Sequence, residues 1–486
     1  MKALGTITMY YPFIDGETKD VVEITMNEAS SYYDFVIRLS DRVCETETSE
    51  ILAYLATVHA HRLSATAVVA RIAEKYNDSL KIRAWAPSIQ KLSCEEMMSE
   101  FEHIIQSIED DWILAEIYVR RLWNSRYLAP LIESERDIQE IEKFLEENSN
   151  LECFSSNFQT LMCDWHLLRG NLDAANECYK KTMEIAEKYD DQYQISSLIS
   201  IYTSWSRTYD AQEALTLQEE GYIIAKSFDA PEFIAESKAD IGRIFEALGE
   251  YDLAILAYLD SLEGYEIDPP NSPAFCLSRV YCELCDGEKA LEWIDTAFEL
   301  AGPVAFDTPF LLSQRAEALV IQGYLEEAAE YLDLSHKVSL KSGRTGHLAT
   351  KGVADGYYEL AQDNPLAAIE VMEPCLDHLI QIPVSIYINR LLIGLARAEN
   401  AANASGLVET SNKWLTRLGQ YAKEKKLPGI LMIHALLKAE SLSTQGLTTS
   451  ALSILEEALS IGNSPSLRTL TERIHTKITE LKMIGI

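Results

Sequence analysis

Apolar positions along most of the chain recur every three or four residues, which is the spacing of a helix with one buried face. The segment ALGEYDLAILAYLDSLEGYEIDPP, residues 247–270, shows how these helices are organised: a helix, Gly249, a second helix, and then Pro269 and Pro270. Glycine adopts the left-handed conformation that ends many helices, and proline cannot continue a helix. The pattern therefore predicts a helical hairpin over this segment.

The same hairpin pattern recurs along the chain at a nearly constant spacing. The predicted turn residues are Gly170, Tyr209, Gly249, Cys285, Gly323, Asp363 and Gly446. Their successive spacings are 39, 40, 36, 38 and 40 residues, followed by 83, which leaves room for one more hairpin near residues 398–415, closed by Pro428. A fixed period of about 40 residues with two helices per unit is typical of a solenoid, so we predict an all-α, helical-hairpin fold.

Small residues at matching positions support this register. The residue seven positions before the turn is small in six of the seven units: Cys163, Gly242, Ser278, Ala316, Gly356 and Ala439. In the clearest unit Ala254 stands five residues after the turn, so that it and Gly242 allow the two helices to approach closely. Tyr258, one turn further on, is expected to pack on the next hairpin.

These hairpins resemble tetratricopeptide repeats. Residues 241–269 are the clearest copy, with Gly242, Phe245, the Gly-Glu-Tyr turn, Ala254, Tyr258 and Pro269 in place. The units are longer than the roughly 34-residue consensus and mostly lack its early Trp. In length they are similar to the helical region of maltose-regulator-like proteins. The resemblance implies a right-handed superhelix whose first helices line a concave groove for a protein or peptide.

We expect three parts along the chain. Residues 1–150 form a mainly helical region, either degenerate repeats or a separate cap, with helices over 22–43, 51–76, 94–127 and 134–147 and strand-like alternation over 1–13. Residues 151–466 form about eight hairpins, and residues 467–486 form a C-terminal capping helix.

Composition excludes several classes of partner. Asp and Glu number 76 against 42 Lys and Arg, and the formal charge of −34 repels nucleic acid and anionic membrane surfaces. The most apolar helical run, residues 51–73, contains four His and Arg residues and is not expected to span a membrane. No signal-peptide pattern precedes it, and nine scattered cysteines are typical of a reducing compartment. We therefore expect a cytoplasmic protein.

The motifs that could carry chemistry are incomplete. Cys282 and Cys285 form a CxxC pair, but zinc needs further ligands at similar spacing, and the pair stands at the end of a helix rather than at its start. His59 and His61 point to different sides of one helix. The segment 343–352 lacks the spacing of a phosphate-binding loop. We predict no catalytic residues, no metal site and no cofactor, and hence no enzyme.

The resemblance also points to groove residues, because the position after the small residue faces the groove in tetratricopeptide repeats. Arg243 and Arg279 occupy this position in adjacent units, and we expect them to form an anion-binding pair for an acidic segment of the partner. Phe275 and Tyr357 would add aromatic contacts.

One alternative remains open for the arginines, and another for the function. Each arginine could instead pair with a nearby glutamate such as Glu246 or Glu283. The function that we favour is a non-catalytic scaffold or adaptor. The alternative is a regulatory sensor whose superhelix closes on a small ligand or peptide.

Overall fold

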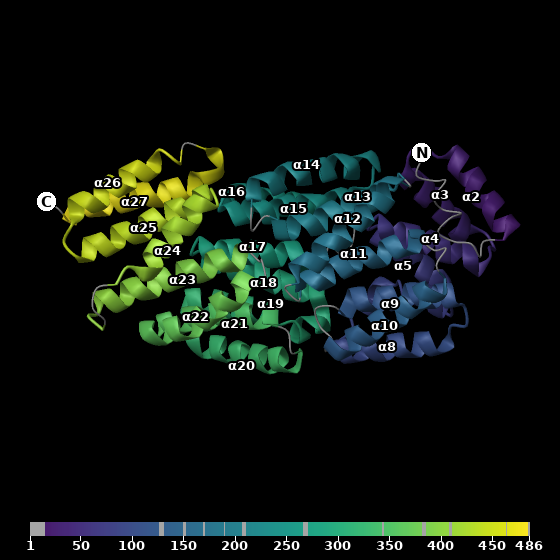
Figure 1. Cartoon of the computed structure of the whole chain (residues 1–486), viewed down its shortest axis with the longest axis horizontal. Helices are drawn as coiled ribbons and strands as arrows, with labels where there is room; N and C mark the ends of the chain where they lie inside the picture. The colour runs from purple at the N-terminus through teal and green to yellow at the C-terminus, as the bar shows by residue number, and fades with distance from the viewer. Residues whose placement is uncertain are drawn as a thin grey trace.

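The computed structural model describes residues 15–125, 131–148, 152–168, 171–188, 190–206, 210–265, 271–342, 345–381, 385–407, 411–462 and 464–484. Every regular element in these ranges is a helix, as predicted, and the helices form an elongated stack from the N-terminal end to the C-terminal end (Figure 1). The strand-like segment 1–13 lies outside the described residues. None of the described helices combines the length and apolarity that crossing a bilayer requires.

The N-terminal region contains nine of the described helices. They are α2 (Gly16–Glu28), α3 (Tyr32–Glu45), α4 (Glu50–Arg62), α5 (Thr66–Lys75), α6 (Leu80–Arg83), α7 (Pro87–Gln90), α8 (Cys94–Ser107), α9 (Asp111–Ser125) and α10 (Leu131–Glu147).

Three helices predicted in this region are each interrupted in the structure. The stretch 94–127 divides into α8 and α9, because Ile108 is extended and the Asp110 carboxylate begins the new helix by accepting hydrogen bonds from the Trp112 and Ile113 amides. The prediction of one helix over residues 22–43 is wrong, because Ala29 is extended and Ser31 begins a new helix by accepting a hydrogen bond from the Asp34 amide. Likewise, the stretch 51–76 is interrupted at Ser64, whose φ of 56° is left-handed. A capping side chain or a single left-handed residue can end one helix and begin the next while the apolar spacing continues. The pattern of apolar residues therefore does not reveal these interruptions.

The remaining helices pair in sequence order as hairpins, each first helix packing on the second. The described pairs are α11 (Glu152–Leu168) with α12 (Leu172–Lys188), α13 (Gln192–Ser206) with α14 (Ala211–Ser227), α15 (Pro231–Leu248) with α16 (Tyr251–Glu263), α17 (Asn271–Glu283) with α18 (Gly287–Ala301), α19 (Pro309–Gln322) with α20 (Leu325–Ser342), α21 (Thr345–Ala361) with α22 (Pro365–Gln381), α23 (Ser385–Ala404) with α24 (Lys413–Glu424), and α25 (Pro428–Thr444) with α26 (Thr448–Leu459). Short 3-10 segments η2 (Gly302–Asp307) and η3 (Pro465–Leu467) precede α19 and α27 (Arg468–Ile484).

The predicted turn residues adopt the conformation that the pattern requires. Left-handed φ values occur at Gly249 (76°), Cys285 (58°), Gly323 (82°), Asp363 (59°) and Gly446 (76°). Gly406, with a φ of 65°, ends the turn after α23 and marks the hairpin that the 83-residue spacing left room for. The predicted turns at Gly170 and Tyr209, and the stop signals at Pro269 and Pro270, lie outside the described residues.

Within the hairpins, small residues accommodate large ones. The Tyr258 ring is fully buried and lies against Gly242, where a Cβ atom would stand 2.7 Å from the ring. Tyr258 thus packs on the first helix of its own hairpin, and it also shares an apolar core with Cys276 and Leu277 of the next hairpin. In the next unit the small residues touch as expected, since the Ser278 hydroxyl donates to the Ala290 carbonyl at 2.8 Å.

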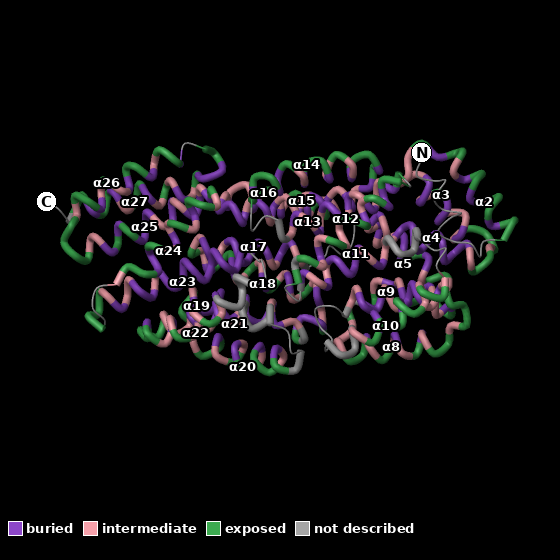
Figure 2. Tube along the Cα trace, in the orientation of Figure 1, coloured by how far each residue is buried: buried purple, intermediate pink, exposed green. Residues whose placement is uncertain are grey.

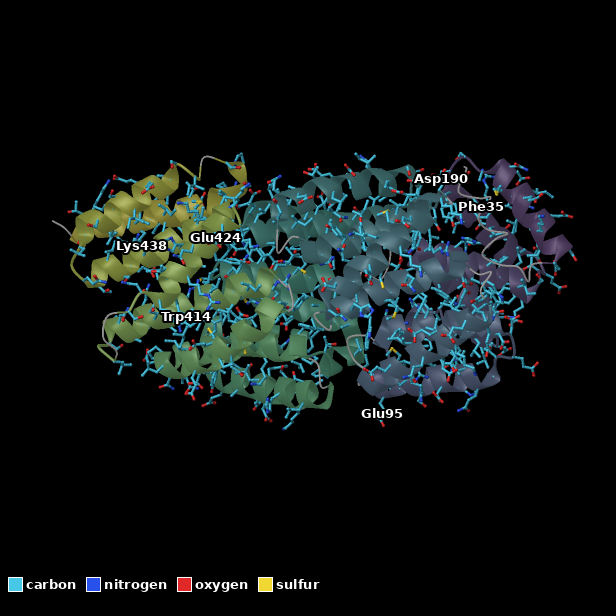
Figure 3. The ribbon with its side chains drawn as sticks, in the orientation of Figure 1. Phe35, Glu95, Asp190, Trp414, Glu424 and Lys438 are labelled. Carbon is cyan, nitrogen blue, oxygen red and sulfur yellow. The ribbon has the colours of Figure 1, made fainter. Side chains whose placement is uncertain are left out.

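The apolar cores run between the helices and join the N-terminal region to the hairpins. Buried residues concentrate where helices face one another, and exposed ones on the outside (Figure 2). The core around Phe35 also includes Phe228 and Phe233 from the α14–α15 junction. Figure 3 places Phe35 near the N-terminal end and Trp414 in the C-terminal half. How the chain divides into separate domains stays a prediction.

The superhelix closes on itself in its C-terminal half. Helices α23, α25 and α27 return to contact α15 and α16. The Asn389 side chain donates to the Ala247 carbonyl at 2.9 Å, and the Asp252 carboxylate accepts hydrogen bonds from the Thr469 amide and hydroxyl at 3.0 and 2.6 Å. The backbones of Gly249 and Gly429 lie so close that a Cβ on either would overlap the other. We call this contact between the α15–α16 turn and helices α23, α25 and α27 the seam.

Candidate functional site

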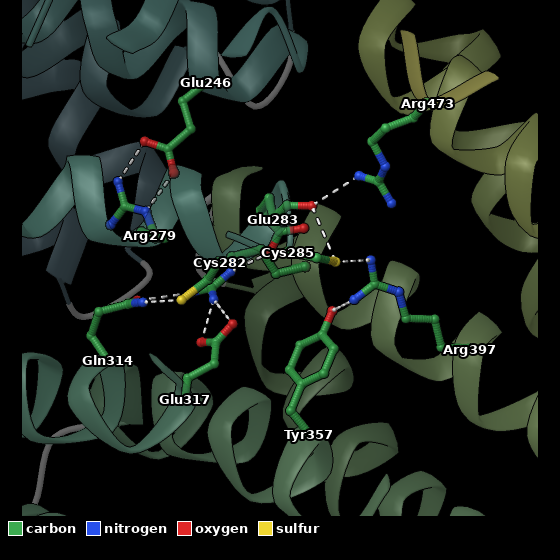
Figure 4. A network of polar contacts seen from close by, with 11 residues as sticks. Glu246, Arg279, Cys282, Glu283, Cys285, Gln314, Glu317, Tyr357, Arg397 and Arg473 are labelled. Carbon is green, nitrogen blue, oxygen red and sulfur yellow. Dashed lines mark hydrogen bonds and ion pairs between the residues drawn. The ribbon is translucent and has the colours of Figure 1, made fainter. Parts of the chain in front are cut away.

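A connected set of polar side chains, most of them charged, lies in the interior between the first helices of several hairpins (Figure 4). Its members come from α15, α17, α19 and α23, and we call it the inner network: Glu246, Arg279, Cys282, Glu283, Gln314, Glu317 and Arg390. All seven are buried. A buried charge persists only when an opposite charge and hydrogen bonds replace its water, so the partners of each charge decide its role.

The first part of the inner network joins α15 to α17. The Arg279 guanidinium donates through Nε and Nη2 to the two carboxylate oxygens of Glu246, at 2.5 and 2.7 Å. The Tyr258 hydroxyl also donates to Glu246 at 2.7 Å. The Phe275 ring lies 4.9 Å below the same guanidinium, which is cation–π geometry. Arg279 is therefore fully engaged by neighbours within the protein.

The second part joins three hairpins through one arginine. Arg390 on α23 donates from Nε to Glu283 Oε1 at 2.8 Å, and its Nη2 donates to both carboxylate oxygens of Glu317 on α19. Gln314 donates to the Cys282 thiol at 3.1 Å beside this cluster. Arg390 is 107 residues from Glu283 in sequence, so the contact depends on how the hairpins pack on one another.

Burial and pairing act in opposite directions on these groups. Burial raises the pKa of Glu317 above its ordinary value, and Arg390 only partly offsets this. Burial alone would lower the pKa of Arg390, but the two glutamates raise it well above the usual value, so it stays charged. Burial also raises the pKa of the Cys282 thiol, which makes a reactive thiolate unfavourable in this half of the CxxC pair.

Two further arginines reach the C-terminal end of α17 from the seam side. Arg397 on α23 donates to the Tyr357 hydroxyl at 3.1 Å and lies 3.9 Å from Cys285 Sγ. Arg473 on α27 donates to the Glu283 carbonyl at 3.3 Å. Figure 4 shows both guanidiniums pointing toward this helix end. Both side chains are half-buried, and we call them the outer pair.

The sequence-predicted groove residues lie in different surroundings. Arg243 is half-buried on α15, pairs with Asp240 and donates to the Ser272 hydroxyl at 2.6 Å. Arg279 is only 4% exposed and pairs with Glu246, which was the open alternative for this arginine. Phe275 and Arg279 lie together, whereas Tyr357 contacts Arg397 instead. Contact of these residues with a partner stays a prediction.

Sequence reasoning missed Arg390, Arg397 and Arg473. A signal for the first two exists, because they stand seven residues apart on α23, where nearly every neighbouring residue is apolar and buried. Polar residues at that spacing face one side of a helix, and on a buried helix they need internal partners. Nothing in the local pattern identifies those partners.

The described residues contain neither a metal-binding cluster nor a disulfide. No group of three or more His, Cys, Asp or Glu side chains among the described residues could hold a metal ion, and no disulfide joins the eight cysteines described there.

Three solved structures are similar to this chain. One is a signal-transduction ATPase with numerous domains, with a tetratricopeptide repeat sensor, from Pyrococcus horikoshii (16% identity, 85% of this chain and 55% of that chain covered, TM-score 0.33). The others are a Rap protein complexed with competence and sporulation factor (12%, 76% and 97%, 0.36) and the apo form of RapI (12%, 76% and 99%, 0.38). This chain thus spans little more than half of the first structure.

No protein-family model matches the chain, and no curated protein matches it. Because the TM-scores are low, these likenesses carry no argument about function. The class rests on the chain's own geometry: paired helices, left-handed turn residues about 40 residues apart, and small residues at the hairpin contacts. This protein is an all-α, tetratricopeptide-repeat-like solenoid.

Proposed function

We propose that this chain is a non-catalytic interaction protein of the cytoplasm, a scaffold or adaptor that binds a protein or peptide segment along the inner side of its first helices. One observation carries the proposal. First helices of successive hairpins direct polar and aromatic side chains to a shared interior, and some of these, Arg243 and Arg397 among them, keep exposed surface. Arginine beside aromatic rings is the composition that dominates binding energy at protein interfaces.

The four predicted residues take different parts in this proposal. Arg243 and Tyr357 contact the partner directly, since Arg243 is half-buried and the Tyr357 hydroxyl lies beside a partly exposed guanidinium. Arg279 and Phe275 form the wall behind them, held in place by Glu246.

Partner capture followed by reconstitution tests the proposal. The tagged chain is used to purify proteins from its own lysate, and the dominant protein is then expressed and its Kd measured by calorimetry. Arg243→Gln should raise this Kd about tenfold, the effect of losing one charge-assisted contact. The matched control is Lys337→Gln on the outer helix α20, where the side chain is 68% exposed. Equal Kd values for the two variants, or no protein that binds in reconstitution, would contradict the proposal.

A regulatory sensor is the second candidate, and the seam favours it. Contacts such as Asp252 with Thr469 join residues 217 apart, so a ligand that strengthens or breaks them changes the shape of the whole chain. A thermal-shift screen with small metabolites and short peptides tests this. A sensor shows a ligand-dependent rise in Tm that Asp252→Asn reduces. An unchanged Tm throughout the screen would leave the scaffold as the function.

A further inference from the structure

The outer pair brings two positive charges to one helix end. Arg473 contacts the Glu283 carbonyl and Arg397 contacts Cys285 Sγ, and these two acceptor atoms lie only 4.0 Å apart. The two guanidiniums come from α23 and α27, which are brought together only at the seam. The partial negative charge at the C-terminal end of α17 favours cations here but amounts to about half a charge, less than the two it faces.

Neither member of the outer pair has a carboxylate partner among the described residues. Every buried arginine of the inner network does: Arg279 has Glu246, and Arg390 has two glutamates. Two acids raise the pKa of Arg397 without forming an ion pair with it. They are Glu283, whose carboxylate pairs with Arg390, and after it Glu440 on α25, which is exposed. The outer pair therefore keeps most of its hydrogen-bonding capacity unused within the protein.

The surroundings of the outer pair suit a carboxylate. Arg397 donates to the Tyr357 hydroxyl oxygen, so the hydroxyl proton remains free to donate to a ligand. Cys285 beside it is exposed, and both arginines are half-buried, so the place is reached from solvent. Planar guanidiniums bind carboxylates through two parallel hydrogen bonds, which makes two arginines and a hydroxyl a specific receptor for this group.

We propose that the outer pair binds a carboxylate of an acidic partner segment, with Arg397 and Arg473 as its two cationic contacts and Tyr357 as a hydroxyl donor. This inference rests on the proposed function and names the chemistry of the partner. A long polyanion is excluded by the net charge of −34, whereas a short segment with few carboxylates approaches a local positive site when salt screens the remainder. Because the two arginines stand on α23 and α27, the bound carboxylate bridges the seam.

A direct binding experiment tests the site on the full chain. A fluorescein-labelled, N-acetylated hexaglutamate peptide is titrated with the protein at about 0.15 M salt, where the screening length is about 8 Å. Arg473→Gln should weaken binding about tenfold. Arg468→Gln on the same helix is the matched control, because Arg468 is exposed and forms no ion pair among the described residues, and it should leave the Kd within about twofold. Glu440→Gln should tighten binding, since it removes an exposed acid that acts on Arg397 from outside the inner network.

Competition with inorganic phosphate separates the sources of the anion. Displacement of the peptide only by large excess of phosphate supports a carboxylate segment, whereas phosphate binding without peptide binding overturns it and marks a free-anion site. Equal weakening by Arg473→Gln and Arg468→Gln overturns the site as well. If the reconstituted partner binds wild type and Arg473→Gln equally, the site is wrong while the scaffold function stands. If no partner binds at all but hexaglutamate does, the scaffold function fails independently of the site.

Discussion

The inner network and the outer pair are two groups of arginines that lie close together and are treated differently by the fold. In the inner network each guanidinium is buried and meets one or two carboxylates. In the outer pair each guanidinium is half-buried and meets only a carbonyl, a hydroxyl or a thiol. The guanidiniums of the first group all form ion pairs within the protein, whereas those of the second form none among the described residues.

This difference shows that position in a repeat does not decide the role of an arginine. Arg279 occupies the groove position expected from tetratricopeptide repeats, yet it forms an internal ion pair with Glu246 of the preceding hairpin. Arg397 and Arg473 come from the hairpin and the helix that complete the closure. The part of the groove near α17 is thus filled by the protein's own side chains. At the seam, the guanidiniums of Arg397 and Arg473 form no ion pair among the described residues.

Removing the arginine that joins three hairpins should have the largest effect. Arg390→Met leaves Glu283 and Glu317 buried without their cation, and breaking a buried pair in this way costs about 3–5 kcal/mol. Urea denaturation followed by circular dichroism measures it. Adding Glu317→Gln to the same protein should recover part of the loss, because it removes one of the orphaned charges. A decrease in the free energy of unfolding below about 1 kcal/mol would show that Arg390 does not pair with Glu283 and Glu317 as described.

Separating the seam should have the next largest effect. In Gly429→Ala the new Cβ meets the backbone of Gly249, which cannot rotate away as a side chain can. The cost of such overpacking is about 1–3 kcal/mol, seen as a lower melting temperature. Gly16→Ala is the control, since no atom lies within 4 Å of its Cβ position. Equal melting temperatures for the two variants would mean that the α15–α16 turn and α25 do not touch in solution.

Neutralising the outer pair should hardly change stability. Arg473 is half-buried and makes one contact with a carbonyl, so Arg473→Gln should change the free energy of unfolding by less than about 0.5 kcal/mol. Chemical denaturation side by side with Arg390→Met measures this contrast. A destabilisation as large as that of Arg390→Met would place Arg473 in the structural group and remove the distinction between the two regions.

An acid outside both groups should show the smallest effect. Burial, and after it the neighbouring Asp240, raise the pKa of Glu236 to about 7, although Ser64 donates to it. Its protonated form is therefore favoured by folding, so its contribution to stability is complete below about pH 4.5 and is lost as the pH rises through about 7. Because Glu236 is nonetheless exposed at the surface, solvent reduces the size of this effect.

The variant Glu236→Gln removes this titration. Its melting temperature relative to wild type should rise between pH 5 and pH 8, measured by differential scanning calorimetry at both values. A constant difference between the two proteins across this range would show that Glu236 titrates normally.

The repeat itself could be predicted from the sequence because its signals are local. The turns are examples. The apolar spacing of one helix ends before Gly249, Cys285 and Asp363, and that of the next helix begins after them, and all three residues have left-handed φ values. The interruptions at Ser31 and Ser64 were not predicted, since a cap or a single left-handed residue can divide a helix without disturbing its apolar spacing.

The partners of Arg390 could not be predicted. Arg390 is 73 residues from Glu317 and 107 from Glu283, and its register depends on how far each hairpin rotates on the previous one. Small rotations add up over several hairpins, and no local pattern encodes their sum. The pairing of Arg279 with Glu246 joins adjacent hairpins, and the sequence could therefore offer it as an alternative.

Small-angle X-ray scattering of the isolated chain tests the central claim, closure at the seam, most directly. The account predicts a scattering curve that matches the closed arrangement, with α27 against the α15–α16 turn, and a larger radius of gyration for Gly429→Ala. A wild-type curve that fits only a superhelix with α23–α27 turned away from α15–α17 would contradict it.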